Sequence, residues 1–360
     1  MTSSLFGRMR LGYVLIASRR LDAWQRFATQ GLGLHAEAAS DGTLALRVDD
    51  RQRRIVVRPG PAEDVVATGW QMDDCDALCL ALARLRALGP APVRLSGPEA
   101  ALRGIDEGWR CQGPKGTFIE LFTEACVQRT DAPLRMRASG FVTGASGLGH
   151  MAITSREPEA MERFWTRTFD ARLSDRIEDR LNGVTMDFAF LRLNERHHSI
   201  AIASTRGLRL DPLRTSIHHL NLQAASFDDV VQGYRQCRAL GYPIASAIGQ
   251  HPNDKELSFY VQSPSDFEIE LGWNPLTVSE EDEPAWQPGA YQGISLWGHF
   301  PENLTAGLKA RQFGRGLLSL TRREHQVGGA ACPPPSSTTS SSPGSAPRGS
   351  CWRIPWASRA

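Results

Sequence analysis

The residues best suited to chemistry in this sequence are its histidines, and they are unevenly distributed. His35 is the only histidine before residue 150, and the other eight of the nine begin with His150. Two imidazoles and one carboxylate can hold one face of a divalent metal and leave the opposite face open, an arrangement typical of non-haem iron(II) enzymes. His150, one member of the His218-His219 pair, and Glu270 can supply that set. The sequence therefore predicts a metal site in the second half of the chain.

The pattern alone does not choose between the two members of the His218-His219 pair. Neighbouring side chains of a strand point to opposite faces, so only one of the two histidines can point inward. The apolar Leu220 and Leu222 share the face of His218. Either histidine is therefore a candidate ligand on this ground.

Further groups able to transfer protons lie in the segments between these candidates, namely His197, His198, His251 and Tyr260. A histidine ionises near neutral pH, so it can accept and return protons during catalysis. A single histidine in an apolar strand is more often a structural residue than a ligand. Their concentration in one half of the chain is what favours a shared site.

The chain contains an internal repeat that makes this asymmetry informative. The segment Leu11 to Phe27 aligns without gaps on Leu148 to Phe164, and identical residues recur at eight positions. Tyr13 stands where the second copy has His150. The residues around Trp70, which match the His218-His219 strand, contain no histidine. Of the three candidate ligands only the glutamate has a counterpart in the first half.

The elements of the two copies also match. Each copy starts with a short apolar run typical of a strand, followed by an amphipathic helix. Each half then has a second helical stretch that ends at Gly89 or Gly241, and glycine is a common helix stop. Each closes with a strand after a proline, at Pro114 to Leu121 and Pro264 to Leu271, which places Glu120 and Glu270 at matched positions.

This pattern predicts an α+β fold with two tandem domains. Each domain is expected to be a pair of βαβββ modules that form an open, barrel-like sheet around a cavity, with the active site in the C-terminal domain. The predicted boundaries are an N-terminal domain without metal at 1–135, a catalytic iron domain at 136–300 and a low-complexity tail at 301–360. The polar stretch 128–146 suits a linker, and the Pro- and Ser-rich composition after residue 328 predicts disorder.

Composition excludes several classes of function. A net charge of +2 gives no electrostatic case for nucleic-acid or membrane partners. Seven cysteines without a CxxC pair suggest reduced thiols and a cytoplasmic location. The sequence contains no glycine-rich phosphate loop and no GxSxG elbow, which argues against a nucleotide-binding protein or a hydrolase.

Five motifs in this order resemble the type I extradiol dioxygenases of the vicinal oxygen chelate superfamily, especially the 2,3-dihydroxybiphenyl 1,2-dioxygenases. The resemblance runs from about Leu11 to the SLWGH motif that ends at His299. The motifs are GLGH (Gly147 to His150), NERHHS (Asn194 to Ser199), IHHLNL (Ile217 to Leu222), HPNDKELSFY (His251 to Tyr260) and EIELGW (Glu268 to Trp273).

The resemblance implies extradiol cleavage of a catechol, with 2,3-dihydroxybiphenyl or a similar bicyclic or substituted catechol as substrate and O2 as co-substrate. It assigns the iron(II) ligands, with Mn(II) as the other metal that the set accepts, to His150, His219 and Glu270. It makes His198 the active-site base, and it implies a homo-oligomer. The other implied catalytic residues are His251 and Tyr260, with Asn253 and Asp254 in the substrate pocket. Phe190, just ahead of the NERHHS motif, is a candidate for the pocket wall.

Two departures from the family and two alternative functions accompany this hypothesis. Ser263, a mild change, stands where the family has Thr, Asn or Asp before the proline, and Asp266 stands where it has a turn glycine. Asp266 is expected either to alter the approach to Glu270 or to need a left-handed backbone, which Asp only tolerates. A metal-dependent, glyoxalase-like lyase is one alternative, and such enzymes usually draw ligands from both halves. A small-molecule binding protein of the same superfamily, which needs no metal, is the other.

Overall fold

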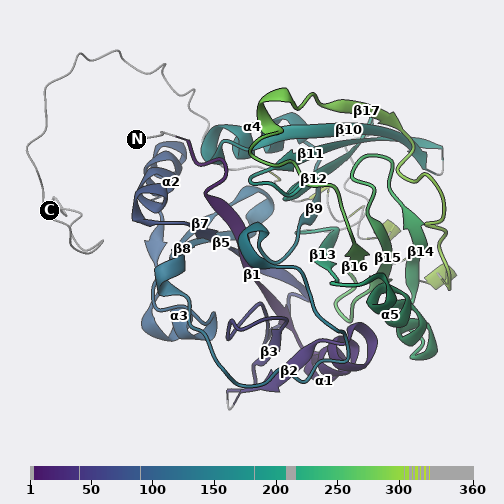
Figure 1. The fold of residues 1–360 in the computed structure, drawn as a ribbon, viewed down its shortest axis with the longest axis horizontal. Coiled ribbons are helices and arrows are strands. Elements are labelled where there is room, and N and C mark those ends of the chain that lie inside the picture. Colours follow the sequence, from purple (N-terminus) through teal and green to yellow (C-terminus); the bar gives the residue numbers. More distant parts are fainter. Residues whose placement is uncertain are drawn as a thin grey trace, which may run out of the picture.

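The computed structural model describes residues 4–324 except residues 40, 90, 182, 208–215, 304, 308, 309, 311, 312, 315, 316, 318, 319, 322 and 323. Predictions for the tail beyond residue 324 lie outside the described residues. Figure 1 shows the first half of the chain, in purple and blue, beside the second half, in teal and green. Each half is built around its own curved sheet.

The first half consists of two βαβββ modules that pair into one eight-stranded sheet with the order β2-β3-β4-β1-β5-β8-β7-β6. The first module contains β1 (Met9–Ser18), α1 (Leu21–Arg26), β2 (His35–Ala38), β3 (Leu44–Arg47) and β4 (Ile55–Pro59). The second module contains β5 (Asp64–Met72), α2 (Cys75–Leu88), β6 (Val93–Arg94), the short helix α3 (Gly97–Leu102), β7 (Trp109–Gln112) and β8 (Phe118–Thr123).

The second half repeats this plan in a nine-stranded sheet with the order β14-β15-β16-β13-β9-β12-β11-β10-β17. Its first module contains β9 (Met151–Thr154), α4 (Pro158–Phe169), β10 (Arg172–Leu181), β11 (Val184–Arg192) and β12 (Ile200–Thr205). Its second module contains β13 (His219–Gln223), α5 (Phe227–Ala239), β14 (Ile244–Gln250), β15 (Leu257–Gln262) and β16 (Glu268–Trp273), and the added strand β17 (Gly289–Gln292) pairs with β10.

The helices begin and end where local chemistry requires. Asp74 caps α2 by accepting a hydrogen bond from Ala77 N at 2.9 Å, and the Ser226 side chain caps α5 in the same way through Asp229 N. Helix α2 ends at Gly89, and α5 is followed by Gly241 in a left-handed conformation at φ 79°. These endings match the expected glycine stops.

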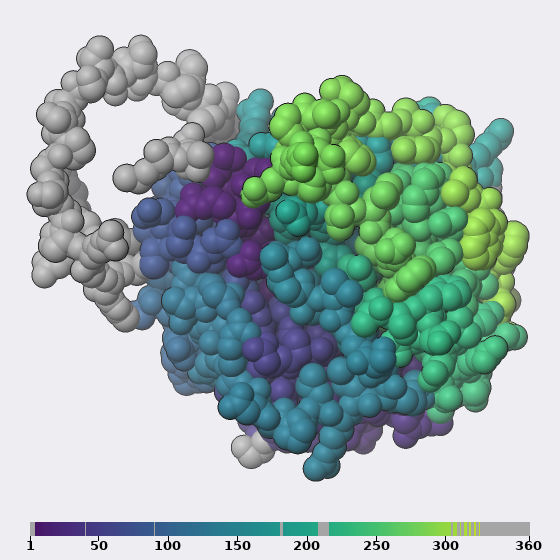
Figure 2. Space-filling view, viewed as in Figure 1, coloured from purple at the N-terminus to yellow at the C-terminus, as the bar shows by residue number. Residues whose placement is uncertain are grey.

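The two halves share a hydrophobic core that is built from side chains of both strands and helices. Trp70 of the first half packs against Trp165 of α4, with ring centroids 5.2 Å apart, and Trp24 of α1 lies 5.6 Å from Phe267. In β13, Leu220 and Leu222 are buried in this core. Because side chains alternate along a strand, His219 points to the opposite face of the sheet. Figure 2 shows the first and second halves in direct contact along their common face.

The α+β fold with two pairs of βαβββ modules is confirmed, with local differences. The first predicted helix is divided, since α1 continues as a single stretch of wider π-helix at Phe27–Leu32. Strand β17 was not predicted, and neither was helix α3, although Ser96 and Glu99 form a capping box at the start of this helix. Asp266 has φ 64°, which confirms the left-handed conformation expected of this turn.

Four of the described cysteines, Cys79, Cys111, Cys126 and Cys237, are free thiols. Among the described residues, no helix is both long enough and apolar enough to cross a membrane.

Candidate metal centre

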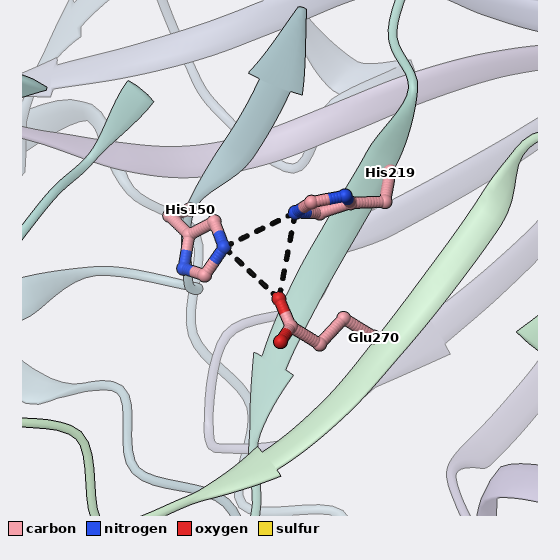
Figure 3. A group of neighbouring side chains, drawn as sticks. All are labelled: His150, His219 and Glu270. Carbon is pink, nitrogen blue, oxygen red and sulfur yellow. Dashed lines mark hydrogen bonds and ion pairs between the residues drawn. The ribbon is translucent and has the colours of Figure 1, made fainter. Parts of the chain in front are cut away.

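Three predicted ligands converge at one point in the second half (Figure 3). His150 Nε2 lies 3.0 Å and His219 Nε2 lies 3.4 Å from Glu270 Oε2, and the two imidazole nitrogens are 3.3 Å apart. The three residues are at most 8 % exposed. Three donor atoms therefore face one another inside the protein, as ligands of a common ion would.

The order of the strands explains why these residues meet. His150 immediately precedes β9, His219 opens β13 and Glu270 lies within β16, and these three strands are neighbours in the sheet. Asn221 N donates a hydrogen bond to His150 O at 2.8 Å. A Cβ on Gly149 would lie 2.0 Å from Asn221 O, so only glycine lets the chain approach β13 closely enough at this point.

The protonation states suit metal binding. Burial alone would raise the pKa of Glu270, but interactions with His150 and His251 hold it well below its usual range. Burial lowers the pKa of His219 well below its usual value. The carboxylate is therefore ionised and this imidazole neutral at neutral pH, which are the states that ligate metals.

Glu270 Oε2 provides a direct test of whether a cation fits. This oxygen is buried and satisfies no hydrogen-bond geometry among the described residues, although two imidazole nitrogens lie within 3.4 Å. A buried, unsatisfied carboxylate oxygen is costly. Two imidazoles and one carboxylate form a set that iron(II) accepts with open positions remaining. The residues present therefore fit a divalent metal.

His198 lies against this centre, with its ring centroid 3.9 Å from that of His150. Burial lowers the pKa of His198 well below its usual value, so the imidazole is neutral at neutral pH. Its Nδ1 lies 3.1 Å from His197 Nδ1, which leaves Nε2 as the ring nitrogen without that contact. His198 is therefore placed to accept a proton beside the metal.

His251 and Tyr260 form a second polar pair. His251 Nε2 lies 2.8 Å from the Tyr260 hydroxyl and 3.4 Å from Glu270 Oε1, and its Nδ1 donates to Ile294 O at 2.7 Å. Burial would lower the pKa of His251, but the bond to Glu270 and the charge of Asp254 raise it to about 9. The pair can therefore donate hydrogen bonds toward the cavity.

All of these groups line one cavity of about 510 Å³. Apolar side chains, among them Met186, Phe188, Phe190 and four alanines, line the cavity together with the candidate ligands and other polar residues. Phe190 meets the His198 ring edge to face, with centroids 5.0 Å apart. The structure brings all nine predicted site residues to this cavity, which are His150, Phe190, His198, His219, His251, Asn253, Asp254, Tyr260 and Glu270.

Two further histidines also belong to this region. His299 lines the cavity and its ring lies 4.4 Å from that of His251. His197 is fully buried and binds Asp175 behind His198. The sequence contained a partial signal for His197, since it adjoins His198, but nothing in the sequence connected it to Asp175.

The first half lacks this centre. Glu120 is engaged by the Tyr13 hydroxyl at 2.6 Å, by Arg103 through both carboxylate oxygens and by Arg110 Nε at 2.8 Å. Its carboxylate is therefore already neutralised by guanidinium groups. This arrangement argues against a lyase that draws metal ligands from both halves.

Comparison with known proteins agrees with this geometry. Residues 11–60 match the model described as dihydroxybiphenyl dioxygenase BphC D1, and residues 147–271 match the glyoxalase/bleomycin resistance protein/dioxygenase superfamily. The biphenyl-2,3-diol 1,2-dioxygenase of Metapseudomonas furukawaii is 34% identical over 292 residues, covering 80% of this chain and 92% of the relative. The chain belongs to the extradiol dioxygenases of the vicinal oxygen chelate superfamily.

Two further relatives bear on chemistry and fold. An iron-dependent extradiol dioxygenase of Rhodococcus jostii is 31% identical over 301 residues, covering 80% of this chain and 96% of the relative. The crystal structure of 2,2',3-trihydroxybiphenyl 1,2-dioxygenase from Sphingomonas wittichii superposes with a TM-score of 0.72 at 28% identity, covering 82% of this chain and 100% of that one. The protein is therefore an extradiol catechol dioxygenase that uses iron(II) and O2.

Proposed function

We propose that this dioxygenase binds iron(II) through His150, His219 and Glu270 and cleaves a bicyclic catechol such as 2,3-dihydroxybiphenyl. The observation that carries the metal assignment is the convergence of their three donor atoms within 3.4 Å of one another, with Glu270 Oε2 buried and otherwise unsatisfied. When bound there, iron(II) would bring catechol and O2 together and allow electrons to pass from the ring to oxygen.

The size and lining of the cavity support a bicyclic substrate. A volume of about 510 Å³ exceeds what a single substituted ring requires, and Met186, Phe188 and Phe190 contribute apolar surface to its lining. Phe190 would pack against the ring system of the substrate, while Asn253 and Asp254 would contact its polar edge. Substituted monocyclic catechols are the second candidate, since they fit the same polar side with fewer apolar contacts.

His198 would act as the base. A catechol must lose phenolic protons to bind as a chelating anion, and the His198 ring lies 3.9 Å from that of His150. In this step the O–H bond of the substrate breaks and a bond to His198 Nε2 forms. The same residue would return the proton later in the cycle. His251 and Tyr260, joined at 2.8 Å, would donate hydrogen bonds to substrate oxygens and stabilise the charge that develops there.

The division of the chain follows from these roles. The proposed N-terminal domain, 1–135, contributes core packing and no metal ligand, and 136–300 is the catalytic domain, followed by the tail at 301–360. The exposed apolar residues Leu296, Trp297 and Phe300 support a homo-oligomer, and light scattering of the purified protein would measure its mass. A cytoplasmic location, and the absence of nucleic-acid and membrane partners, stay predictions of the sequence.

The proposed roles are tested by loading the protein with iron(II) anaerobically and then adding 2,3-dihydroxybiphenyl or 3-methylcatechol in air. Formation of a yellow ring-cleavage product is expected with both, and a higher kcat/KM with the bicyclic substrate. His198→Ala is expected to retain iron and to lose about 10²–10⁴-fold in kcat. His35→Ala, which removes a histidine of the first half, serves as the control. Full turnover by His198→Ala would refute the assignment of the base.

A further inference from the structure

We propose that Asp175 and His197 are positioning residues, which hold His198 in the tautomer that presents an unprotonated Nε2 to the catechol. This inference rests on the proposed role of His198 as the base. Neither of these two buried residues lines the cavity, and neither belongs to the proposed metal ligands. The proposal predicts which substitutions preserve the positioning of His198 and which abolish it.

The first link is between Asp175 and His197. His197 Nε2 lies 2.7 Å from Asp175 Oδ2, and the two side chains are 0% and 2% exposed. A carboxylate accepts hydrogen bonds and donates none, so His197 must carry its proton on Nε2. The Nδ1 atom of the neutral His197 imidazole then carries a lone pair and accepts hydrogen bonds.

The second link is between the two histidines. His197 Nδ1 and His198 Nδ1 are 3.1 Å apart, with the rings nearly perpendicular at 89°. Since His197 offers a lone pair, His198 must donate from Nδ1, which leaves a lone pair on its Nε2. Asp254 Oδ2, 3.8 Å from His198 Nδ1, favours the same proton position. The Asp175 carboxylate thus determines, through the intervening His197 ring, which nitrogen of His198 carries the proton.

The surroundings fix Asp175 in place. Gly289 N donates to Asp175 Oδ1 at 2.5 Å, because β17 pairs with β10 at this residue. A Cβ on Gly289 would lie 2.9 Å from the same oxygen, so glycine permits this approach. Trp286 packs against His197, with ring centroids 5.9 Å apart. Strand β17, which had no evident role in the sequence, therefore completes the support of the base.

The arrangement also stabilises the base after it has accepted a proton. When the catechol O–H bond breaks and the Nε2–H bond forms, His198 becomes an imidazolium whose Nδ1–H still donates to His197. The negative charge of Asp175, which binds the His197 ring, stabilises this positive charge in a buried, low-dielectric environment. No proton needs to pass from His198 to His197 or from His197 to Asp175.

Asp175→Asn provides the sharpest test. Its amide oxygen can still accept from Gly289 N, but its amide nitrogen would face His197 Nε2 and force the opposite tautomer. His197 would then donate from Nδ1, and His198 would present an N–H instead of a lone pair to the substrate. We expect kcat for 2,3-dihydroxybiphenyl to fall at least about tenfold, by analogy with the loss of an orienting Asp in a catalytic triad. The KM and the iron content should stay within twofold of the wild type.

Two substitutions of His197 separate positioning from packing. His197→Gln can accept from His198 through its amide oxygen and donate to Asp175 through its amide nitrogen, so it should recover most of kcat. His197→Leu fills a similar volume but makes neither bond, and should lose at least about tenfold in kcat relative to His197→Gln. Glu178→Gln, which changes an exposed carboxylate on the outward face of the same strand, is the matched control.

The outcomes distinguish this inference from the proposed function. If the wild type is inactive or His198→Ala is fully active, the proposed function fails. If both behave as proposed but Asp175→Asn keeps the wild-type kcat, or His197→Gln and His197→Leu have equal kcat, the positioning role is wrong. Should Asp175→Asn lose iron or fail to fold, the comparison of the two His197 variants decides alone.

Discussion

The two halves of the molecule bury a glutamate at the same place in the same fold and neutralise it in different ways. Glu120 accepts hydrogen bonds from Tyr13, Arg103 and Arg110, and the Arg103 and Arg110 guanidiniums carry fixed positive charge. Glu270 is surrounded by imidazoles, and its Oε2 has no satisfied hydrogen bond among the described residues. A buried carboxylate requires a compensating cation. The first half supplies that cation from its own arginines, and we propose that a metal supplies it in the second half.

The pairing of the strands shows which residues of the two halves are equivalent. Glu120 pairs with Gly69 and Arg110, whereas Glu270 pairs with Asn221 and Tyr260. The equivalent of Tyr260 in the first half is therefore Arg110. Counting two residues back along β5 and β13, the equivalent of His219 is Ala67, which pairs with Phe118 as His219 pairs with Glu268. The first half thus replaces one ligand by a methyl group and one polar cavity residue by a cation.

The largest expected effect is the loss of the metal. His150→Ala removes one of three ligands, and we expect iron to be lost and kcat/KM to fall more than about 100-fold, beyond what is typical for changes to residues that only support a ligand. Iron analysis of the purified protein and the ring-cleavage assay would measure both. His35→Ala is the histidine control in the first half, and equal iron content in the two variants would contradict the assignment.

The next effect is on stability, and it concerns the first half. Glu120→Gln leaves the buried Arg103 without its carboxylate, so we expect the free energy of unfolding to fall by about 3–5 kcal/mol. The iron content and kcat of the folded protein should not change. Urea denaturation followed by circular dichroism would measure the loss. Glu99→Gln, which removes a more exposed partner of Arg110, should cost less than about 1 kcal/mol.

A smaller effect is expected from Tyr13→Phe. This change deletes only the hydroxyl that donates to Glu120 at 2.6 Å, while both arginines remain. A hydrogen bond to a charged group contributes about 1.5–3 kcal/mol, and that is the expected loss in the free energy of unfolding. A loss as large as that of Glu120→Gln would show that the hydroxyl, and not the arginines, stabilises the carboxylate.

The smallest effect concerns the turns that precede the two glutamates. Gly116 has φ 77° and Asp266, at the matched position, has φ 64°. Asp266→Gly should change the free energy of unfolding by less than about 1 kcal/mol, because relief of the left-handed conformation offsets the added freedom of the unfolded chain. Asp266→Val should cost more, since a β-branched residue tolerates positive φ poorly. Thermal unfolding of the iron-loaded protein would compare them, and equal stability would show that the turn is unstrained.

Much of the fold, and the half of the chain that carries the site, could be predicted from the sequence because both depend on local sequence patterns. The repeat, the apolar alternation and the glycine stops predicted both pairs of βαβββ modules. The histidines identified the half that carries the centre, since no other part of the chain collects so many. The choice of His219 over His218 came from resemblance. In the structure both histidines line the cavity, but His219 Nε2 lies 3.4 Å from Glu270 Oε2, whereas His218 precedes β13 and its Nε2 lies 3.8 Å from Glu268 Oε2.

The rest depended on contacts between distant segments. Arg103 and Arg110 bind Glu120 from a loop and a neighbouring strand, and nothing local marks either as the partner of a buried carboxylate. Asp175 reaches His197 across 22 residues, and its position depends on Gly289 more than a hundred residues later. Such long-range pairs leave no periodic signal in a single sequence.

The most direct test of the account is the iron stoichiometry of two matched variants, Glu270→Gln and Glu120→Gln, loaded anaerobically and assayed with 2,3-dihydroxybiphenyl. The account predicts one iron per chain and undiminished ring cleavage for Glu120→Gln, and neither iron nor yellow product for Glu270→Gln. Iron retained by Glu270→Gln, or lost from folded Glu120→Gln, would contradict the claim that only the second half holds the metal.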